Sequence, residues 1–211
     1  MGQVMQGFDC DVLLSSLPSL GAFNEPMTNA GDNKTYQITA SAHRYLDDTQ
    51  PFTLQMSADG VTAWTAVPAS TVYKVQWPIG TVVFAVPQIP SFIRASTLSY
   101  FTVSSVGDAY GWTLTLVTNK QDVTPFQQFW HSKVVTIKDA TSKITTYRFD
   151  DLFAPLLGNK MVLILYADKT VGTRWICYAT LDGDDVKSAT TGIVATDISF
   201  DCQGEVFFLA V

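Results

Sequence analysis

Glutamate, histidine and cysteine are scarce in this chain, and charged residues of either sign are few. Of its 19 acidic residues, 17 are Asp and only 2 are Glu. Because Glu favours helices whereas Asp favours turns, this imbalance argues against a helical protein. Charged residues make up 15% of the sequence, well below the usual share of about a quarter. Much of the surface must therefore be Thr, Ser, Gln and backbone, and such a chain often hides surface in an assembly.

The residue types that transfer protons or bind metals are too few to predict an enzyme. Only His43 and His131 could serve a nucleophilic triad, and neither lies in a G-x-S-x-G elbow. The acidic run 182–185 lacks the order and the closing Glu of an EF-hand loop. Cysteine occurs at three positions, Cys10, Cys177 and Cys202. Their odd number and spacing predict buried thiols, rather than a disulfide framework or a zinc site. We therefore expect no catalytic residue, no metal and no cofactor.

Long apolar runs and basic clusters are also missing. No apolar run approaches the roughly 20 residues of a membrane span, and the first residues, MGQVMQGFDCDV, show no signal-peptide pattern. The net charge of −6 argues against a protein that grips nucleic acid, because phosphate binding needs clustered Lys and Arg. It does not exclude contact with DNA that slides past.

Two stretches show the period-two alternation of β-strands with one dry face. In residues 111–117, apolar Trp112, Leu114 and Leu116 alternate with Thr113, Thr115 and Val117. In the C-terminal run, Ile198, Phe200 and Cys202 alternate with Ser199, Asp201 and Gln203. Beyond Gly204, residues 206–208 show no polar face and are expected to be buried on both sides.

The rest of the chain predicts an all-β protein with one short α-helix. Residues 1–35 are expected to form an extended N-terminal arm, and residues 36–211 a single β domain. That domain comprises N-terminal strands (36–106) and a core (107–211). Turns are predicted at 58–60 and 78–80, a long loop or protruding hairpin at 118–133, two strands around 139–142, a helix at 149–158 and a loop at 182–192.

Charge is unevenly distributed along the second half of the chain. Residues 120–148 contain five bases and two acids, whereas residues 150–205 contain nine acids and four bases. This asymmetry suits head-to-tail contacts between copies, which close into rings or stack into filaments. Scattered, solvated charges would give the same counts, so both interpretations stay open.

Several of these segments occur in an order that is similar to a known family. GDAYGWTLTLVTNKQDVTPF is followed by a short predicted helix, MVLILYAD, RWICYATL, an acidic loop and DISFDCQGEVFF. In this order the second half, residues 107–211, resembles the tail tube proteins of long-tailed bacteriophages. The segment HRYLDDTQPFTLQMSADGVTAW also looks like phage virion sequence, but the first half resembles the family only weakly.

The resemblance implies a β-sandwich or barrel that assembles as stacked hexameric rings in the virion tail. Double-stranded DNA would pass through the lumen without specific binding, and an acidic lumen would let it slide. Other implied partners are the tape measure, tail terminator and baseplate or tip proteins, and synthesis would take place in the bacterial host cytoplasm. We assign contacts between subunits or rings to Lys120, Asp122, Phe126, Phe129, Trp130 and Lys133. A luminal or opposing acidic surface is assigned to Asp182, Asp184 and Asp185.

Two other functions stay open from the sequence. The first is a capsid decoration or head-tail connector protein, which would use the same kind of contacts between copies. The second is a β-sandwich carbohydrate-binding module, which would require two or three coplanar aromatic side chains on an exposed face.

Overall fold

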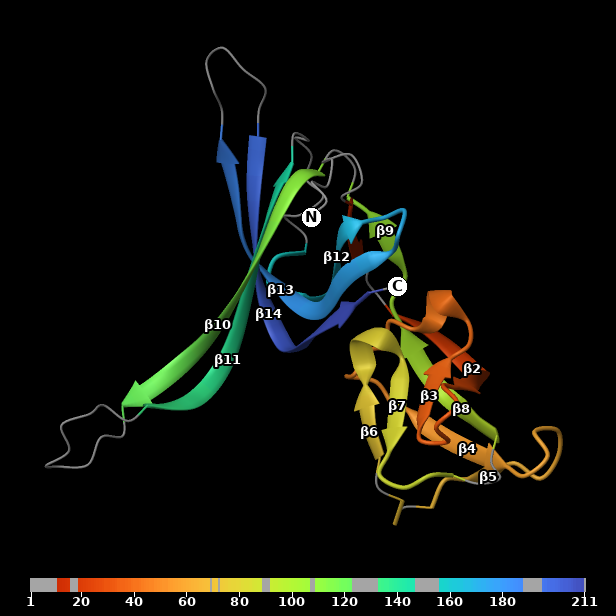
Figure 1. Ribbon diagram of the computed structural model, residues 1–211. Coiled ribbons are helices and arrows are strands. Elements are labelled where there is room, and N and C mark those ends of the chain that lie inside the picture. The colour runs from red at the N-terminus through yellow and green to blue at the C-terminus, as the bar shows by residue number, and fades with distance from the viewer. Residues whose placement is uncertain are drawn as a thin grey trace, which may run out of the picture. The chain divides into compact units, whose positions relative to one another are not determined.

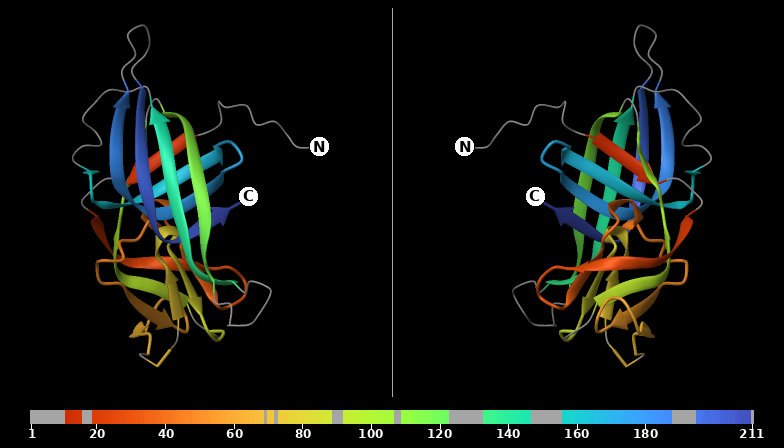
Figure 2. Two further views of the ribbon diagram at one scale, coloured as in Figure 1. Left: turned by 90° about the vertical axis from the view of Figure 1, so that its left-hand side faces the viewer. Right: turned by 90° about the vertical axis from the view of Figure 1, so that its right-hand side faces the viewer.

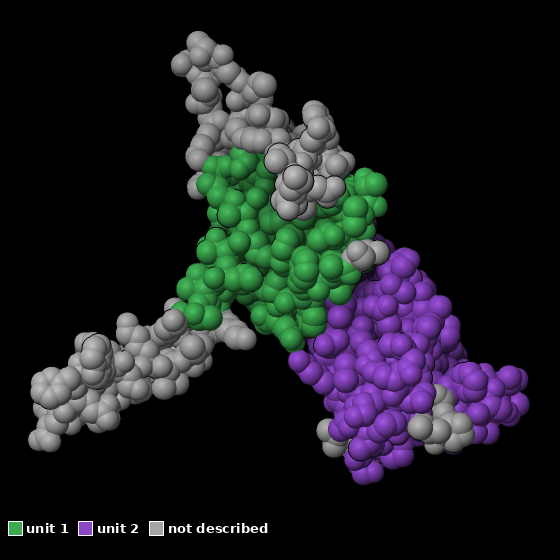
Figure 3. All heavy atoms as spheres, in the orientation of Figure 1, with its two compact units in different colours: residues 1–13, 105–211 green, residues 14–104 purple. Residues whose placement is uncertain are grey.

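The protein folds almost entirely into antiparallel β-sheet. The computed structural model describes residues 11–15, 19–68, 70–71, 73–88, 92–106, 109–122, 133–146, 156–187 and 195–210. The chain divides into two compact units, residues 1–13 with 105–211 and residues 14–104 (Figure 3). Each unit is built around its own seven-stranded sheet. The all-β class predicted from the sequence is therefore confirmed.

The first unit is built on one sheet whose strand order is β10-β11-β14-β13-β12-β1-β9 (Figure 1). The strands of this sheet are β1 (Asp11–Ser15), β9 (Val103–Ser105), β10 (Ala109–Asp122), β11 (Lys133–Thr146), β12 (Lys160–Asp168), β13 (Thr173–Lys187) and β14 (Ala195–Leu209). The division between the units falls within β1 and β9. Figure 2 shows that this sheet curls, so that β10 and β11 cross over β12 and β1. Apolar side chains fill the inside of the curl, and Ile144, Leu163, Ile198 and Phe200 are each no more than 1% exposed.

The second unit is built on a sheet of order β5-β4-β8-β2-β3-β7-β6. Its elements are β2 (Leu20–Asn29), β3 (Thr35–Ile38), η1 (Ser41–His43), β4 (Thr53–Ser57), β5 (Thr65–Ala66), β6 (Tyr73–Gln76), η2 (Trp77–Ile79), β7 (Thr81–Phe84) and β8 (Phe92–Tyr100). Its core includes Tyr36, Ile38, Val82, Phe84 and Leu98, and the rings of Tyr36 and Phe84 meet edge to face at 5.7 Å.

Several predicted turns lie where the sequence placed them. Residues 58–60 follow β4 in the connection to β5, and Pro78 and Gly80 lie between β6 and β7. Gly80 has a φ of 61°, the left-handed conformation that glycine adopts at little cost. The strands β12 and β13 contain the segments MVLILYAD and RWICYATL, respectively.

Other predicted elements differ from the structure. Residues 139–142, expected to separate two strands, lie within the single strand β11, because they pair with β10 on one side and β14 on the other. Residues 118–122, expected to belong to a long loop or protruding hairpin, are part of β10 and pair with β11. Residues 182–187, expected to be loop, belong to β13. The predicted helix lies mostly outside the described residues, and at its C-terminal end Leu157 instead forms a parallel bridge with Leu181.

The N-terminal region and the domain division also differ from the expectation. Within the expected arm 1–35, β2 pairs with β8 along residues 20–26 and with β3 along residues 27–29. The expected single domain 36–211 spans parts of both units, and the division near residue 106 lies close to the boundary between Ser104 and Ser105. Strand pairing of β2 depends on partners distant in sequence, so the local Pro and Gly content of this stretch did not predict it.

Candidate assembly surfaces

Among the described strands, β10 forms one edge of the first sheet and is the longer of its two edge strands. It is 14 residues long and pairs with β11 on one side, whereas β9 at the other edge has only 3 residues. An edge strand presents a row of backbone N–H and C=O groups that can pair with another chain. Soluble proteins usually shorten or cover such edges, and β10 is long for an edge strand.

Beyond the sheet, β10 and β11 continue as a two-stranded ribbon. The strand β11 pairs with β14 only over residues 140–146, but its pairing with β10 continues to Asp122 opposite Lys133. The ribbon is visible in Figure 1, where the green ends of β10 and β11 leave the sheet. An isolated two-stranded ribbon is marginally stable in water. Contacts with another chain would therefore stabilise this part of the fold.

A fork opens where β14 leaves the ribbon, at Gly204. This glycine has a φ of 84°, a backbone conformation that residues other than glycine rarely adopt. Up to Cys202, β14 pairs with both β11 and β13, whereas residues 207–209 pair with β13 alone. The left-handed residue thus coincides with the change in pairing, and it allows β14 to turn away from β11.

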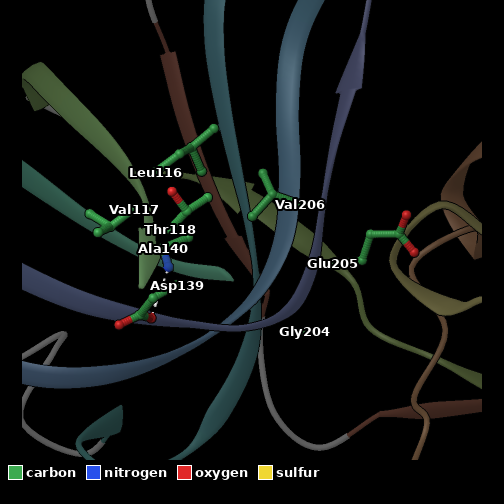
Figure 4. Close-up of a pocket in the computed structure, with 8 residues that line it drawn as sticks. All are labelled: Leu116, Val117, Thr118, Asp139, Ala140, Gly204, Glu205 and Val206. Carbon is green, nitrogen blue, oxygen red and sulfur yellow. Dashed lines mark hydrogen bonds between the residues drawn. The ribbon is translucent and has the colours of Figure 1, made fainter. Parts of the chain in front are cut away.

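The fork contains a depression of about 400 Å³ with an apolar wall. Figure 4 shows the β10 side chains on one side of it and those of β14 on the other. Its lining comprises Leu116, Val117, Thr118, Asp139, Ala140, Gly204, Glu205 and Val206. Leu116 belongs to the dry row of β10, after Trp112 and Leu114, yet it is 62% exposed. The core of the single chain therefore covers only part of the apolar face of β10.

The dry row of β10 is thus only partly buried. Trp112 and Leu114 are half-buried, and the Trp112 indole N–H donates to the Tyr166 carbonyl at 3.0 Å. The C-terminal end of β14 is similarly open. Phe208, expected to be buried, is 55% exposed, although its ring lies 4.9 Å from that of Trp175. The expectation for residues 206–208 was wrong because β11 no longer flanks β14 there.

The strands β10, β11, β13 and β14 have a second face, opposite the apolar one, that is polar and rich in hydroxyl groups. A second depression of about 470 Å³ crosses it. Its lining includes Thr113, Thr115, Thr141, Lys143, Asp182, Ser199 and Asp201. This set contains one base and two acids, and Lys143 is itself paired with a third acid, Asp197. The face therefore carries a surplus of negative charge.

Asp197 anchors this polar face. It is 7% exposed, its Oδ2 lies 3.0 Å from Nζ of Lys143, and its Oδ1 accepts a hydrogen bond of 2.9 Å from the Thr145 hydroxyl. The Lys143 side chain is half exposed, which weakens the ion pair through solvent screening. Most of the stabilisation must therefore come from the hydrogen bonds to the buried carboxylate.

We expect Asp197→Ala to lower the free energy of unfolding by about 1–2 kcal/mol, because it removes these hydrogen bonds. Asp201→Ala is the matched control on the same face and strand, where the side chain is exposed. Its expected effect is within about 0.5 kcal/mol. Urea unfolding curves measure both, and equal losses would contradict the anchoring role of Asp197.

Three of the six sequence-predicted contact residues lie on the ribbon. Lys120 and Asp122 are in β10, and Lys133 is the first residue of β11, opposite Asp122. Phe126, Phe129 and Trp130 lie outside the described residues. The predicted acidic surface is on β13, where Asp182 is exposed and lines the polar depression. Asp184 and Asp185 follow it on the same strand, paired in register with Ile198 and Asp197.

The apolar fork was not predicted, although the sequence carries two signals for it. The dry row of β10 ends in Leu116, and a glycine interrupts the C-terminal strand at position 204. The described part of the chain contains no group of three or more His, Cys, Asp or Glu residues that could hold a metal ion. No helix there has the length and apolar character needed to cross a membrane.

Comparison with known proteins finds similarity at the level of structure. No family model matches the sequence, and no curated protein matches it. One similar solved structure is a chain from the virion of a native gene transfer agent particle, with 12% identity and a TM-score of 0.42 over 51% of this chain and 89% of that chain. Another is a chain from the tail of an empty gene transfer agent particle with C6 symmetry, with 9% identity and a TM-score of 0.40 over 75% of this chain and 96% of that chain.

Proposed function

We propose that this chain is a structural protein of a phage-like virion tail, and that its copies join into stacked rings that form the tail tube. The observation that carries the proposal is the edge strand β10, which is long, has a neighbour on one side only among the described strands, and is apolar at Leu116. A ring closes every such edge, because each copy supplies the missing partner of the next. Rings of six copies are what the sequence resemblance implies.

The fork suits a contact between copies. Burying a leucine side chain such as Leu116 contributes about 2 kcal/mol, and every copy in a ring would make the same contact. Val117 and Val206 extend the apolar wall, and Val117 is 46% exposed. The edge of β10 offers backbone hydrogen bonds to another copy, and the apolar wall of the fork offers hydrophobic burial.

The polar face suits a tube lumen. Its threonine and serine hydroxyls offer no fixed positive charge, and its carboxylates outnumber its one lysine. A surface of this kind repels phosphate groups, so that double-stranded DNA slides past instead of binding. We assign Asp182 and Asp185 to this luminal face, since Asp185 is in register with Asp197. Asp184 is in register with Ile198 of the apolar row, so the assignment does not extend to it. Residues 118–133 are assigned to contacts between rings or neighbouring copies.

The remaining parts of the proposal follow from the resemblance. The tape measure, tail terminator and baseplate or tip proteins would be the partners of the assembled tube. The protein would be made in the bacterial host cytoplasm and would function in the virion tail.

The test is the oligomeric state of the purified protein over a concentration series, measured by light scattering and by electron microscopy. We expect rings or tubes that appear above a threshold concentration. A protein that stays monomeric at every concentration, with or without a nucleating tail complex, would contradict the proposal. Stable trimers would instead favour a capsid decoration protein.

A further inference from the structure

We propose that Cys177 and Cys202 form a redox modification site, in which an oxidant of the peroxide class converts the two thiols into an intramolecular disulfide. Cys177 lies on β13 and Cys202 on β14, and both are buried as free thiols. The Cys177 thiol donates to the Cys202 sulfur, with the two Sγ atoms 3.4 Å apart. A disulfide needs about 2.0 Å between these atoms, so a small approach closes the bond.

The backbone around the pair allows this approach. The register of β13 and β14 shifts between Ile176 and Tyr178, so Cys177 has no partner in register on β14. Such irregularities bend a strand and redirect its side chains. Cys202 lies in register between Ala140 and Ala179. These two methyl groups leave more space beside the Cys202 sulfur than larger side chains would.

The hydrogen bond also makes the two sulfur atoms chemically different. Accepting a hydrogen bond from the Cys177 thiol lowers the pKa of Cys202, against the opposing effects of burial and of the carboxylates of Asp201 and Asp139. Donation to Cys202, together with burial, raises the pKa of Cys177. The thiolate is the reactive form of cysteine. Cys202 is therefore the residue that reacts first, and Cys177 is the one that resolves the intermediate.

The reaction balances with one peroxide molecule. The Cys202 thiolate attacks one oxygen of hydrogen peroxide and breaks the O–O bond, which gives a sulfenic acid and a hydroxide that is protonated to water. The Cys177 sulfur then attacks the Cys202 sulfur and forms the S–S bond. Hydroxide leaves and takes the Cys177 proton to form a second water. Two thiols are oxidised by two electrons, and both peroxide oxygens are reduced.

A route for a small oxidant lies beside Cys202. Its neighbour in register, Ala140, lines the depression at the fork, and so does Gly204, two residues further along β14. Cys202 is 8% exposed, compared with 2% for Cys177. The more reactive thiol is thus also the more accessible one.

The disulfide would tie β13 to β14 just before the turn at Gly204. The two cysteines are 25 residues apart, and closing a loop of that size restricts the unfolded chain. The bond would therefore raise the midpoint of thermal unfolding by several degrees and would hold β14 in the position that opens the fork. This inference depends on the thiol geometry alone and stands apart from the proposed function.

The test uses full-length protein that carries Cys10→Ser, so that only this pair remains. Folded protein is treated with hydrogen peroxide, unfolded, and labelled with a thiol reagent. We expect both thiols to be lost, a peptide containing Cys177 to be linked to one containing Cys202, and the midpoint of thermal unfolding to rise by several degrees. Adding a reductant should reverse all three results.

The control adds Cys202→Ser to the same background, and Cys202→Ala replaces it if that variant does not fold. Peroxide should leave its unfolding midpoint unchanged or lower it. Three results would overturn the proposal. The folded parent could still show two labelled thiols after peroxide treatment, the linkage could form only after denaturation, or both cysteines could be oxidised to sulfinic acids. None of these results depends on whether the protein assembles.

Discussion

Replacing Gly80 with alanine is expected to destabilise the second unit by about 3 kcal/mol or more. A Cβ added at this position would lie 2.7 Å from both the Cα and the carbonyl oxygen of Arg44. These are backbone atoms, so no side-chain rotation relieves the contact. Gly80 also accepts a hydrogen bond of 3.0 Å from the Ile38 N–H. Moving its backbone away from Arg44 would therefore weaken the link between η2 and β3.

Gly158→Ala separates this steric effect from the cost of the backbone conformation. Gly158 has a φ of 73°, close to the 61° of Gly80, but no heavy atom lies within 4 Å of a Cβ added there. The left-handed conformation alone costs alanine about 1–2 kcal/mol. Because the two glycines are in different units, hydrogen exchange resolved by peptide is the appropriate measurement. Equal losses of protection in the two variants would show that the approach to Arg44 carries no cost of its own.

The elements that the sequence predicted correctly are those set by neighbouring residues. The alternation of Trp112 and Leu114 with Thr113 and Thr115 reports the two faces of one strand, wherever that strand pairs. The turn at Gly80 is similarly local, because only glycine takes a left-handed conformation at little cost. Both features can be found in a window of a few residues, and both are present in the structure.

The elements that it missed depend on strand partners distant in the sequence. Asp139 and Ser142 resemble turn residues, yet they continue β11, because both pair with β10 and β14 pairs with β11 from Ala140 onward. Ser142 is 3% exposed. The strand β2 contains Pro26, which lies where its pairing changes from β8, along Leu20–Pro26, to β3, along Met27–Asn29. Local propensity competes with pairing in both cases, and pairing prevails.

The fork could not be predicted for the same reason. The exposure of Leu116 depends on where β14 turns away, and that turn is set by Gly204 on a strand far along the chain. The sequence shows a dry row on β10 but not how much of the row the core covers. The acidic residues 182–185 were found as a cluster, whereas their place on a strand facing β14 required the fold.

Leu116→Asp is expected to raise the threshold concentration for assembly by more than tenfold and to leave the monomer folded. The side chain is 62% exposed in the single chain, so its replacement costs the monomer little. In an assembled ring it would remove about 2 kcal/mol of hydrophobic burial from each contact and place a carboxylate beside Asp139 and Glu205, which already line the fork. Each 1.4 kcal/mol corresponds to about a factor of ten in the association constant.

Val171→Asp is the matched control, because it introduces the same charge at an exposed apolar residue of the same unit. Val171 is 50% exposed and lies in the turn between β12 and β13, away from the edge strand in the sheet order. Light scattering should give Val171→Asp the same threshold concentration for assembly as the parent. The threshold of Leu116→Asp should be higher. If both variants assemble poorly, added negative charge is the cause. If Leu116→Asp assembles as readily as the parent, the fork is not the contact between copies, and the apolar end of β10 must have another partner.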